Sequence, residues 1–470
     1  MQGYSPWEIS PTRRIYIPKA NGKQRPLGIP VIRDRVMQAV VKNALEPVWE
    51  AKFEAHSYGF RPGRSAHDAI SQVHNRLCKG HDLWVLDADI KGAFDNISHE
   101  YILKTIGPVP GRELIKQWLR AGYVEAEIYH KTESGTPQGG VVSPLLANIA
   151  LHGLETVLDK HKKTLTRMRT TPKGTPYQTR RYAPKYGYIR YCDDFVVSAK
   201  HEADIEAIVP EIKAWLGERG LELNEEKTQI RKVSEGFNYL GFNIRQYTDQ
   251  SCLCKPQKEK VLSKLREIKE WLRKHKTAKA ATVISYLNPI LRGWSNYYKS
   301  GSSKQVFTYV HHRLVMLLWR WSKRRHPQKG SKWVKRKYFG TIGGDRWRFY
   351  ARTKDREGKD KVQYLIRISD VSIRRHIKVR GNASPDDPTL SEYWKARQTR
   401  QGKMRWAKGS KYYLVARAQQ WKCPGCGEYL LNGEVLQTHH KQAVKDGGDS
   451  SIENLLHLHR SCHAQVHGVT

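Results

Sequence analysis

Two short apolar runs separated by a pair of acids are the clearest feature of the hydrophobic pattern. The run 188–190 (Tyr-Ile-Arg) precedes 191–194 (Tyr-Cys-Asp-Asp), and the run 195–197 (Phe-Val-Val) follows it. Short runs of aromatic and β-branched residues are typical of strands. The pattern therefore predicts a hairpin with two adjacent carboxylates at its tip, and the segment 86–90 (Leu-Asp-Ala-Asp-Ile) predicts a second acid-bearing strand upstream.

Helical periodicity appears in two longer segments. Between Arg33 and Glu46 apolar residues recur at helical spacing, and Pro47 is expected to end that helix. Its apolar positions are Val36, Met37, Val40, Val41, Ala44 and Leu45. From Lys255 to Lys274 an apolar stripe with Lys and Arg elsewhere predicts an amphipathic helix with a basic outer face. Its apolar positions are Val261, Leu262, Leu265, Ile268 and Leu272.

Basic and aromatic residues alternate from Ser322 to Arg380. The rings there are Trp333, Tyr338, Phe339, Trp347, Phe349 and Tyr350. Such a mixture suits a single nucleic-acid strand, because bases stack on rings while cations follow the phosphates. Alternatively the rings form the core of a small β unit. From Arg380 to Tyr412 little apolar periodicity is present, which predicts a linker followed by a short helix.

The charge balance narrows the choice of partners. The 470 residues include 83 Lys and Arg against 45 Asp and Glu, a formal charge of +38. This charge argues against small neutral substrates and favours a polyanion. No apolar run predicts a membrane span, since the longest patch, 314–319, is broken by Arg320. Seven cysteines, three of them in one C-terminal cluster, indicate a reducing compartment and a metal site instead of disulfides.

The acids around 87–89 and 193–194 have a chemical interpretation. Carboxylate oxygens hold divalent ions well, and two-metal nucleotidyl transfer uses them to clamp the attacking and leaving oxygens. The simpler interpretation of adjacent aspartates is a solvated turn, but the strand flanks and the upstream acids favour a site. Asp87 and Asp89 share one strand face, so their spacing leaves open which of them contributes.

A second candidate centre lies near the C-terminus. Two cysteines separated by two residues form a knuckle that can share one tetrahedral zinc, and a His-x-x-Cys pair repeats that spacing. These predicted ligands of a structural Zn²⁺ are Cys423, Cys426, His459 and Cys462. His457 is the alternative to His459 as the fourth ligand.

The sequence 191–194 resembles the Tyr-X-Asp-Asp signature of reverse transcriptases, and the surrounding blocks resemble the proteins encoded by mobile group II introns. These blocks are 17–19 (Ile-Pro-Lys), 25–30 (Arg-Pro-Leu-Gly-Ile-Pro), 57–63 (Ser-Tyr-Gly-Phe-Arg-Pro-Gly), 136–140 (Thr-Pro-Gln-Gly-Gly) and 238–242 (Asn-Tyr-Leu-Gly-Phe). The resemblance extends along almost the whole chain. Because the family usually has several tens of residues before the block near Ile15, we expect a naturally short start, a truncated one, or a surface supplied by another molecule.

The resemblance implies roles for individual polymerase residues. The catalytic ligands of two Mg²⁺ ions would be Asp89, Asp193 and Asp194. Phe94 would lie under the sugar as a steric gate that favours deoxynucleotides. Lys19 and Arg25, on either side of a predicted turn, would hold the triphosphate of a dNTP. Gln138 would contact the same nucleotide.

The C-terminal histidines resemble the HNH nuclease motif. That motif implies that His439, His463 and His467 hold a catalytic divalent ion. His440 would activate water, and Asn454 would orient His440. A His-rich zinc-binding module, or a knuckle that only binds DNA, is the alternative.

The expected fold class is α+β multidomain, a right-hand polymerase followed by a small, zinc-containing ββα treble-clef-like HNH domain. The expected domains are fingers and palm at 1–245, a helical thumb or maturase segment at 246–325, a basic DNA-binding segment and linker at 326–412, and the HNH endonuclease at 413–470. Residues 292–298 (Arg-Gly-Trp-Ser-Asn-Tyr-Tyr) resemble the maturase motif, although plain helix packing explains their rings equally well.

The resemblance implies an RNA-directed DNA polymerase of a mobile intron. The protein would bind group II intron RNA, assist splicing, nick target DNA and extend the exposed 3′-hydroxyl with dNTPs, as in intron homing and retrotransposition. A bacterial-type cytoplasmic location with the ribonucleoprotein or nucleoid, and no membrane partner, would accompany this role. The alternatives are a splicing cofactor whose polymerase is inactive or partner-dependent, and a nuclease-led homing protein with a vestigial polymerase.

Overall fold

The computed structural model describes most of the chain. The described residues are 9–18, 22, 24–170, 176–249, 251–342, 345–354, 360–406, 409–431 and 436–466. They divide into two compact units, Met1–Asn382 and Ala383–Thr470. Among the described residues, no helix combines the length and the apolar character needed to cross a membrane.

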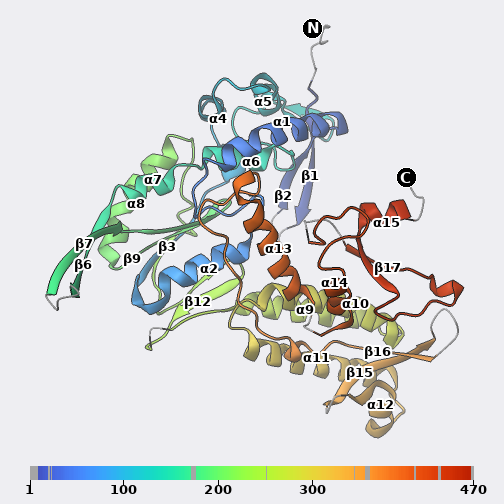
Figure 1. Ribbon diagram of the computed structural model, residues 1–470. Coiled ribbons are helices and arrows are strands. Elements are labelled where there is room, and N and C mark those ends of the chain that lie inside the picture. Colours follow the sequence, from blue (N-terminus) through green and yellow to red (C-terminus); the bar gives the residue numbers. More distant parts are fainter. Residues whose placement is uncertain are drawn as a thin grey trace. The chain divides into compact units, whose positions relative to one another are not determined.

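The first unit is built on an antiparallel sheet with the strand order β10-β3-β9-β8. Its strands are β3 (Trp84–Asp89), β8 (Gly187–Tyr191), β9 (Asp194–Ala199) and β10 (Gln229–Lys232). β8 and β9 are buried along most of their length, which explains why the sequence shows continuous apolar runs there instead of alternation. One hydrophobic core joins the sheet to α4 (His99–Ile106), α6 (Ser143–Ala150) and α8 (Glu202–Gly217), and Figure 1 shows α8 beside β9.

A second sheet, ordered β2-β1-β4-β5, is formed largely by the N-terminal hairpin. Its strands are β1 (Thr12–Pro18), β2 (Gln24–Ile29), β4 (Tyr123–Glu125) and β5 (Ile128–His130). β1 and β2 pair antiparallel, as the predicted turn between them requires. Shorter helices complete this half of the unit. They are α2 (Ala66–Leu77), the 3₁₀ turn η1 (Cys78–Gly80), α3 (Ala93–Asn96), α5 (Arg112–Arg120) and α7 (Leu154–Asp159).

The first long helix is longer than predicted. α1 (Ile32–Glu50) continues through Pro47, so the prediction that this proline ends the helix is wrong. A proline removes one backbone hydrogen bond. However, Trp49 and Glu50 in the last turn are buried, and the Glu50 carboxylate accepts two hydrogen bonds of 2.8 Å from the Arg61 guanidinium. These tertiary contacts outweigh the lost bond.

The predicted apolar stripe of α1 is also partly wrong. Val36 and Val40 are 58% and 57% exposed, while Gln38 between them is buried. The Gln38 carboxamide oxygen accepts a hydrogen bond of 2.7 Å from the backbone N–H of Val141. A polar contact with a distant loop therefore sets the rotation of this helix, and hydrophobic periodicity alone cannot predict it.

A small sheet leads into three long helices. These elements are β11 (Phe237–Tyr239), β12 (Phe242–Gln246), β13 (Cys252–Pro256), α9 (Lys258–Lys274), α10 (Ala280–Tyr298) and α11 (Lys304–Arg325). The predicted amphipathic helix is confirmed, because Val261, Leu265, Ile268 and Leu272 are buried on α9. Leu262 is 36% exposed and lies at the edge of that stripe.

Aromatic packing fixes the end of α10 to the small sheet. The Tyr297 hydroxyl donates a hydrogen bond of 2.7 Å to the Leu240 carbonyl. The rings of Tyr297 and Tyr298 lie 5.5 Å and 5.1 Å from the ring of Phe242. Packing within the protein is thus sufficient to explain these two rings of the segment 292–298.

The basic segment that follows is built around a three-stranded sheet, β14-β15-β16. Its elements are α12 (Ser331–Tyr338), β14 (Phe339–Ile342), β15 (Asp345–Lys354), β16 (Asp360–Tyr364) and the 3₁₀ turn η2 (Ile368–Asp370). Tyr338, Phe339 and Phe349 are buried, and the rings of Tyr338 and Phe339 both contact the ring of Phe349. For these three rings the alternative of a small β core is correct, whereas Trp347 is 39% exposed.

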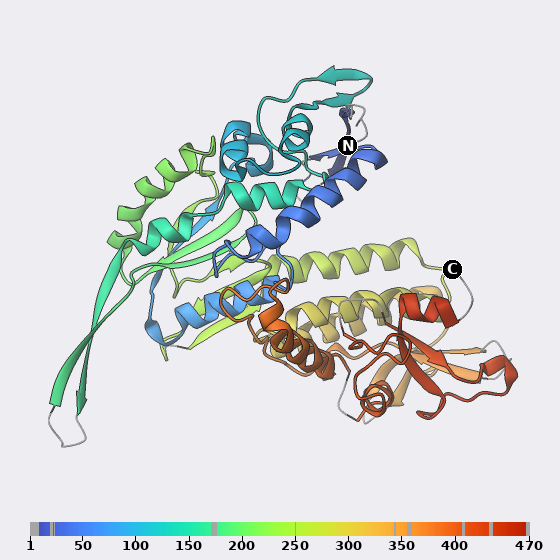
Figure 2. The ribbon, with the colours of Figure 1, turned by 45° about the horizontal axis from the view of Figure 1, so that its top comes forward.

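A two-stranded ribbon extends from the first unit. β6 (Lys162–Thr170) and β7 (Pro176–Pro184) pair antiparallel along their whole length, and Figure 2 shows the ribbon reaching away from the central sheet. The residues from Lys162 to Pro184 include no acid.

The second unit contains a helical part and a small ββα part. Its elements are η3 (Pro388–Leu390), α13 (Ser391–Arg405), α14 (Lys411–Ala418), β17 (Leu436–His440), η4 (Val444–Asp446), β18 (Leu455–His459) and α15 (Arg460–Val466). α13 occupies much of the segment 380–412, where the sequence predicts a linker and a short helix. The buried Trp394 indole donates a hydrogen bond of 2.7 Å to the Ser384 carbonyl and fixes the start of α13.

Candidate functional site

Three carboxylates lie together at one end of the central sheet. β8 and β9 form the predicted hairpin, with Tyr191 paired to Asp194 and with Cys192 and Asp193 in the turn. On the other side of β9, Asp194 is paired to Asp89, the last residue of β3. The fold therefore brings Asp89, Asp193 and Asp194 to one edge, although they are distant in the sequence.

The charges of these acids interact. Desolvation, followed by repulsion from Asp193, Asp89 and Asp87, raises the pKa of Asp194 to about 7. Desolvation is also the main reason why the pKa of Asp193 is raised, and Asp89 adds to it. A divalent cation would relieve this repulsion, and carboxylate oxygens are its preferred ligands. The donor set fits Mg²⁺.

Asp87 remains part of the cluster. It precedes Asp89 by two residues on β3, and burial raises its pKa to about 6, with Arg231 opposing and Asp89 adding to the shift. Its charge also contributes to the raised pKa of Asp194. The geometry therefore brings a fourth carboxylate near the site.

Two residues that the sequence interpretation missed hold Asp89 in place. Lys227 Nζ donates a hydrogen bond of 2.7 Å to Asp89 Oδ2, and Asn224 Nδ2 donates one of 3.2 Å to the same oxygen. The backbone N–H of Asn224 also donates to the Asp89 carbonyl, at 2.8 Å. Both residues lie on the loop between α8 and β10, where polar side chains are common, so the sequence offers no distinctive signal for them.

The N-terminal hairpin brings a cation toward the carboxylates. Arg25 of β2 is paired to Ile17 of β1, and its positive charge lowers the pKa of Asp193 against the effect of desolvation. Lys19, predicted to act with Arg25, lies outside the described residues.

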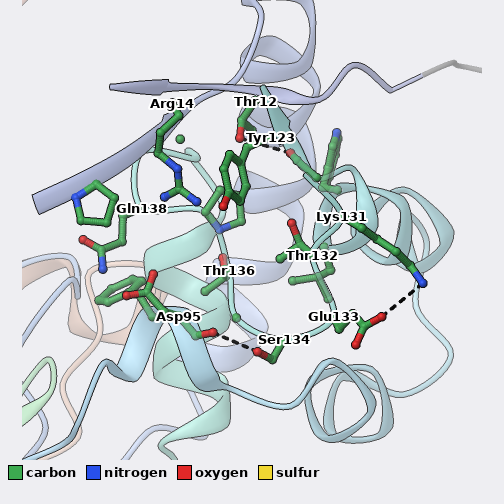
Figure 3. A pocket seen from close by; sticks show the side chains of 18 of the residues that line it. Thr12, Arg14, Asp95, Tyr123, Lys131, Thr132, Glu133, Ser134, Thr136 and Gln138 are labelled. Atoms are coloured by element: carbon green, nitrogen blue, oxygen red, sulfur yellow. Dashed lines mark hydrogen bonds and ion pairs between the residues drawn. The ribbon is translucent and has the colours of Figure 1, made fainter. Parts of the chain in front are cut away.

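Phe94 and Gln138 line one cavity of about 430 Å³. Figure 3 shows Gln138 there with Asp95, Thr136 and Arg14. Backbone hydrogen bonds fix both predicted residues, from Thr136 N to the Phe94 carbonyl at 2.6 Å and from Gly28 N to the Gln138 carbonyl at 2.9 Å. The cavity thus brings together a ring, a carboxamide and strands of the N-terminal sheet.

The second unit gathers a set of metal-ligating side chains. Each of four residues offers a ligand atom, and these atoms all lie within 4.8 Å of one another. The residues are Cys423, Cys426, His459 and Cys462. Burial opposes ionisation of the Cys423 thiol, but hydrogen bonds from the backbone of His459, Gly425 and Cys426 hold its pKa below the usual value. Three thiols and one imidazole at this spacing fit tetrahedral zinc.

The histidine in this set is His459, and the alternative His457 is engaged elsewhere. His459 Nδ1 lies 3.3 Å from Cys426 Sγ, while its Nε2 lies 3.1 Å from the Tyr429 carbonyl. A second nitrogen that donates to a carbonyl is the usual way in which a zinc-binding imidazole is oriented. His457 instead uses Nδ1 toward Thr438 and Nε2 toward the Tyr412 carbonyl.

The predicted nuclease histidines lie on β17 and α15. The rings of His439 and His463 are 5.3 Å apart, so the fold brings this predicted pair together. His440 Nε2 is 3.1 Å from Ser450 Oγ. His467 lies outside the described residues.

Asn454 braces the loop after His440. Its Oδ1 accepts a hydrogen bond of 2.8 Å from Gln442 N, and its Nδ2 donates to the carbonyls of Gln442 at 3.1 Å and Asp449 at 2.6 Å. Any orienting effect on His440 therefore passes through the loop backbone.

Three family models match this chain. They are reverse transcriptase (RNA-dependent DNA polymerase) over 17–244, the group II intron maturase-specific domain over 261–339, and HNH endonuclease over 423–468. The chain thus carries the three kinds of domain that its motifs resemble.

Curated proteins with similar sequences cover parts of the chain. Protein YkfC of Escherichia coli (strain K12) is 37% identical over 256 residues, which are 50% of this chain and 66% of that protein. Group II intron-encoded protein LtrA of Lactococcus lactis subsp. cremoris is 36% identical over 282 residues, 50% of this chain and 47% of LtrA. The chain thus spans less than two thirds of the length of these curated relatives. Among solved structures, apo telomerase from Candida tropicalis aligns with a TM-score of 0.40 and 12% identity, over 70% of this chain and 58% of that one.

Proposed function

Since this chain belongs to the reverse transcriptase and maturase proteins of group II introns, we propose that its first unit copies RNA into DNA. The observation that carries this proposal is that Asp89 and Asp194 are paired on adjacent strands, with Asp193 in the turn next to them. Two Mg²⁺ ions held there would supply charge stabilisation for an in-line displacement.

The protein's own residues would select and position the substrates. Arg25, with Lys19, would bind the triphosphate of the incoming dNTP, since guanidinium and ammonium groups pair well with phosphate. Gln138 would contact the nucleotide, and Phe94 would exclude a 2′-hydroxyl by collision. Asn224 and Lys227 would hold the Asp89 carboxylate in its orientation.

Primer extension tests the polymerase. Purified protein would be given an RNA template, a DNA primer, dNTPs and Mg²⁺. We expect full-length product, and we expect Asp193→Asn to lower the rate by about 1,000-fold, which corresponds to about 4 kcal/mol of lost transition-state stabilisation. Asp249→Asn, which removes an acid outside the cluster, serves as the control. Absence of product from folded protein that still binds RNA would overturn the proposal.

The steric role of Phe94 predicts a change in sugar selection. Phe94→Val removes the ring, so we expect ribonucleotide incorporation relative to deoxynucleotide to rise by about ten- to a hundredfold, the usual range for a difference of one small group in a pocket. Single-nucleotide incorporation with dNTP and the matching NTP measures this ratio. An unchanged ratio would remove Phe94 from the sugar site.

We propose a structural zinc and a nuclease for the second unit. Zn²⁺ would be held by Cys423, Cys426, His459 and Cys462. A second divalent ion would be held by His439 and His463, with His467, next to His440 as the base that activates water. Conversion of supercoiled plasmid to the nicked form with Mg²⁺ or Mn²⁺ tests this, with His440→Ala as the inactive variant. Nicking that survives His440→Ala contradicts the assignment.

We also propose that the protein binds its intron RNA, assists splicing and primes DNA synthesis from the 3′-hydroxyl of nicked target DNA. The maturase-specific match and the charge of +38 support this role. We place it in a bacterial-type cytoplasm with the intron ribonucleoprotein. Splicing that persists in Asp193→Asn while extension is abolished would separate the two activities, and splicing by a wild type that never extends primers would favour the splicing-cofactor alternative.

A further inference from the structure

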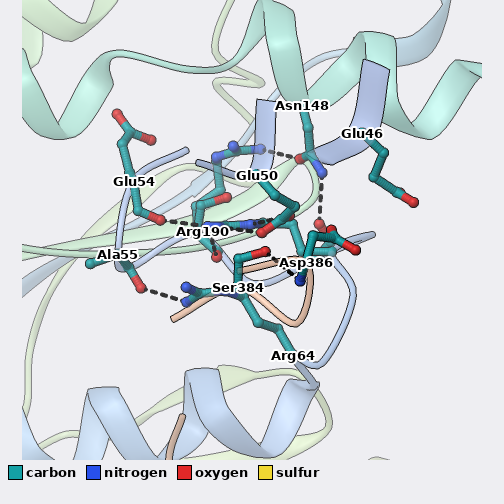
Figure 4. Close-up of polar contacts among 12 residues, drawn as sticks. Glu46, Glu50, Glu54, Ala55, Arg64, Asn148, Arg190, Ser384 and Asp386 are labelled. Atoms are coloured by element: carbon teal, nitrogen blue, oxygen red, sulfur yellow. Dashed lines mark hydrogen bonds and ion pairs between the residues drawn. The ribbon is translucent and has the colours of Figure 1, made fainter. Parts of the chain in front are cut away.

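One arginine next to the carboxylate hairpin is buried and forms no direct ion pair among the described residues. Arg190, in β8, is 1% exposed, and the described residues place no carboxylate oxygen within ion-pair distance of it. Its Nη1 donates to the Asn148 side-chain oxygen at 3.0 Å and to the Cys192 carbonyl at 3.1 Å. Figure 4 shows the contact between Arg190 and Asn148. Burying a guanidinium is costly unless hydrogen bonds and opposite charge offset the cost, and here the charge of the buried Glu54 also interacts with Arg190.

The residue that Arg190 contacts has a constrained backbone. Cys192 has a φ of +59°, in the left-handed region that residues with a Cβ avoid. Gly59 passes directly over it, and a Cβ added there would lie 2.3 Å from Cys192 N. A two-residue hairpin turn requires a positive φ at this position, and a residue with a Cβ makes it costly, so contacts that hold Cys192 stabilise the turn that carries Asp193.

Hydrogen bonds connect the crossing segment to the same arginine. Asn148 Nδ2 donates to the Gly59 carbonyl at 2.9 Å while its Oδ1 accepts from Arg190. The Arg190 backbone donates to the His56 carbonyl and accepts from Tyr58 N, both at 2.9 Å. Segment 56–59, helix α6 and the hairpin therefore meet at one residue, Arg190.

We propose that Arg190 is a positioning residue of the polymerase site, holding the left-handed turn at Cys192 so that the Asp193 and Asp194 carboxylates face the metal ions together. The inference rests on the proposed polymerase function. Asn148 fixes the guanidinium, and the missing side chain of Gly59 leaves room for the turn. A displacement of about 1 Å in such carboxylates is enough to lower a rate about a hundredfold.

Arg190→Lys tests the proposal, because it keeps the charge but loses the rigid, planar guanidinium that places Nη1 between the Asn148 and Cys192 oxygens. We expect the magnesium concentration for half-maximal extension to rise about tenfold and kcat to fall about ten- to a hundredfold. KM for dNTP and the affinity for RNA should stay within about twofold. Asn148→Ser should move the magnesium dependence in the same direction, and the double variant should be less than additive.

Arg219→Lys is the matched control. Arg219 is also buried, at 4% exposure, and its Nε donates to the Ala150 carbonyl at 2.9 Å. Within the described part of the chain its other side-chain contacts are with Trp215, Glu218 and Tyr101, away from the hairpin. If the arginine at either position is purely structural, its substitution should lower the melting temperature and leave the magnesium dependence unchanged. If Arg190→Lys is folded and has the wild-type magnesium curve, the positioning role is excluded.

Direct Mn²⁺ binding, measured by electron paramagnetic resonance, separates this inference from the polymerase proposal. Weaker Mn²⁺ binding by Arg190→Lys than by wild type, with no extension by either, would support the positioning role and overturn the polymerase. Extension by wild type, with equal Mn²⁺ binding by wild type and Arg190→Lys, would support the polymerase and exclude the positioning role. Should Arg190→Lys fail to fold, Gly59→Ala tests the same turn from the other side, and unaltered Mn²⁺ binding by that variant would count against the proposal.

Discussion

Asp87 and Asp89 are two residues apart on β3, yet their surroundings differ. Asp89 ends the strand beside Asp194 and has one carboxylate oxygen fixed by Asn224 and Lys227. Asp87 lies two residues before the end of β3, where burial raises its pKa to about 6. A carboxylate that is fixed at the sheet edge can hold an ion in a defined position, whereas one that is costly to ionise is better suited to shape the local field. We therefore expect Asp89 to be the ligand.

Paired substitutions distinguish the two acids. Asp89→Asn should reduce primer extension by about 1,000-fold, because a carboxylate ligand contributes several kcal/mol in a two-metal site. Asp87→Asn should reduce it by less than about tenfold and lower the pKa of Asp194, since one repulsive charge is lost. Extension rates measured as a function of pH report both effects. Equal losses for the two variants would assign Asp87 to the metal site as well.

The individual site residues differ in how far the sequence predicts them. The hairpin acids could be predicted because their signal is local: two apolar runs around an Asp-Asp pair. Lys227, Asn148 and Arg190 act through contacts with segments far away in the sequence, and their own surroundings have no pattern that indicates a site. A single sequence identifies the groups that perform chemistry better than the groups that hold them.

At the scale of elements, the same contrast between local and long-range signals explains which helices the sequence predicts correctly and which it does not. Helix α9 follows its apolar stripe, and four of its five predicted apolar positions are buried. Helix α1 departs from its stripe and passes through Pro47, because Gln38 and Glu50 make polar contacts with distant loops. The knuckle of the second unit is predictable for a third reason: Cys-x-x-Cys spacing already specifies the geometry of a turn that can share a metal.

The cysteine cluster predicts one zinc per chain in the second unit. Metal analysis of purified protein should find it, and Cys462→Ser should remove it, because three ligands hold structural zinc far less well than four. Since Cys423 and Cys462 are themselves part of the hydrophobic cluster of that unit, loss of zinc should make it sensitive to protease while the first unit persists. Cys78→Ser, at a free cysteine outside the cluster, is the control. Full zinc content in Cys462→Ser would refute the assigned ligand set.

At the scale of the whole molecule, the end of the first unit closes back onto its beginning. The buried Asp68 of α2 accepts hydrogen bonds from the Val379 backbone at 2.7 Å and from His376 Nε2 at 2.9 Å. Arg64 donates to the Gly381 carbonyl at 2.8 Å. These contacts join residues that are more than 300 positions apart in the sequence. Formation of the first unit therefore depends on a chain segment that follows the maturase-type helices.

This closure predicts an acid-sensitive contribution to stability. Burial alone would raise the pKa of Asp68, but the hydrogen bonds from His376, Ser65 and Val379 bring it down to about 2. A carboxyl group with a depressed pKa in the folded state stabilises the protein at pH values above its unfolded pKa, near 4, and the stabilisation is lost as the pH falls toward 2. The shift corresponds to about 2 kcal/mol.

Asp68→Asn should therefore lower the free energy of unfolding of the first unit by about 2 kcal/mol or more at pH 6, because it removes the charge and leaves buried donors without an ionised acceptor. The difference from wild type should shrink as the pH falls from 5 to 3, because wild type loses the ionised Asp68 while the variant has none to lose. Urea unfolding at several pH values measures this, with the exposed Glu235→Gln as the control. A difference that does not change with pH would mean that Asp68 contributes through packing alone, since only the ionised carboxylate makes the closure depend on protons.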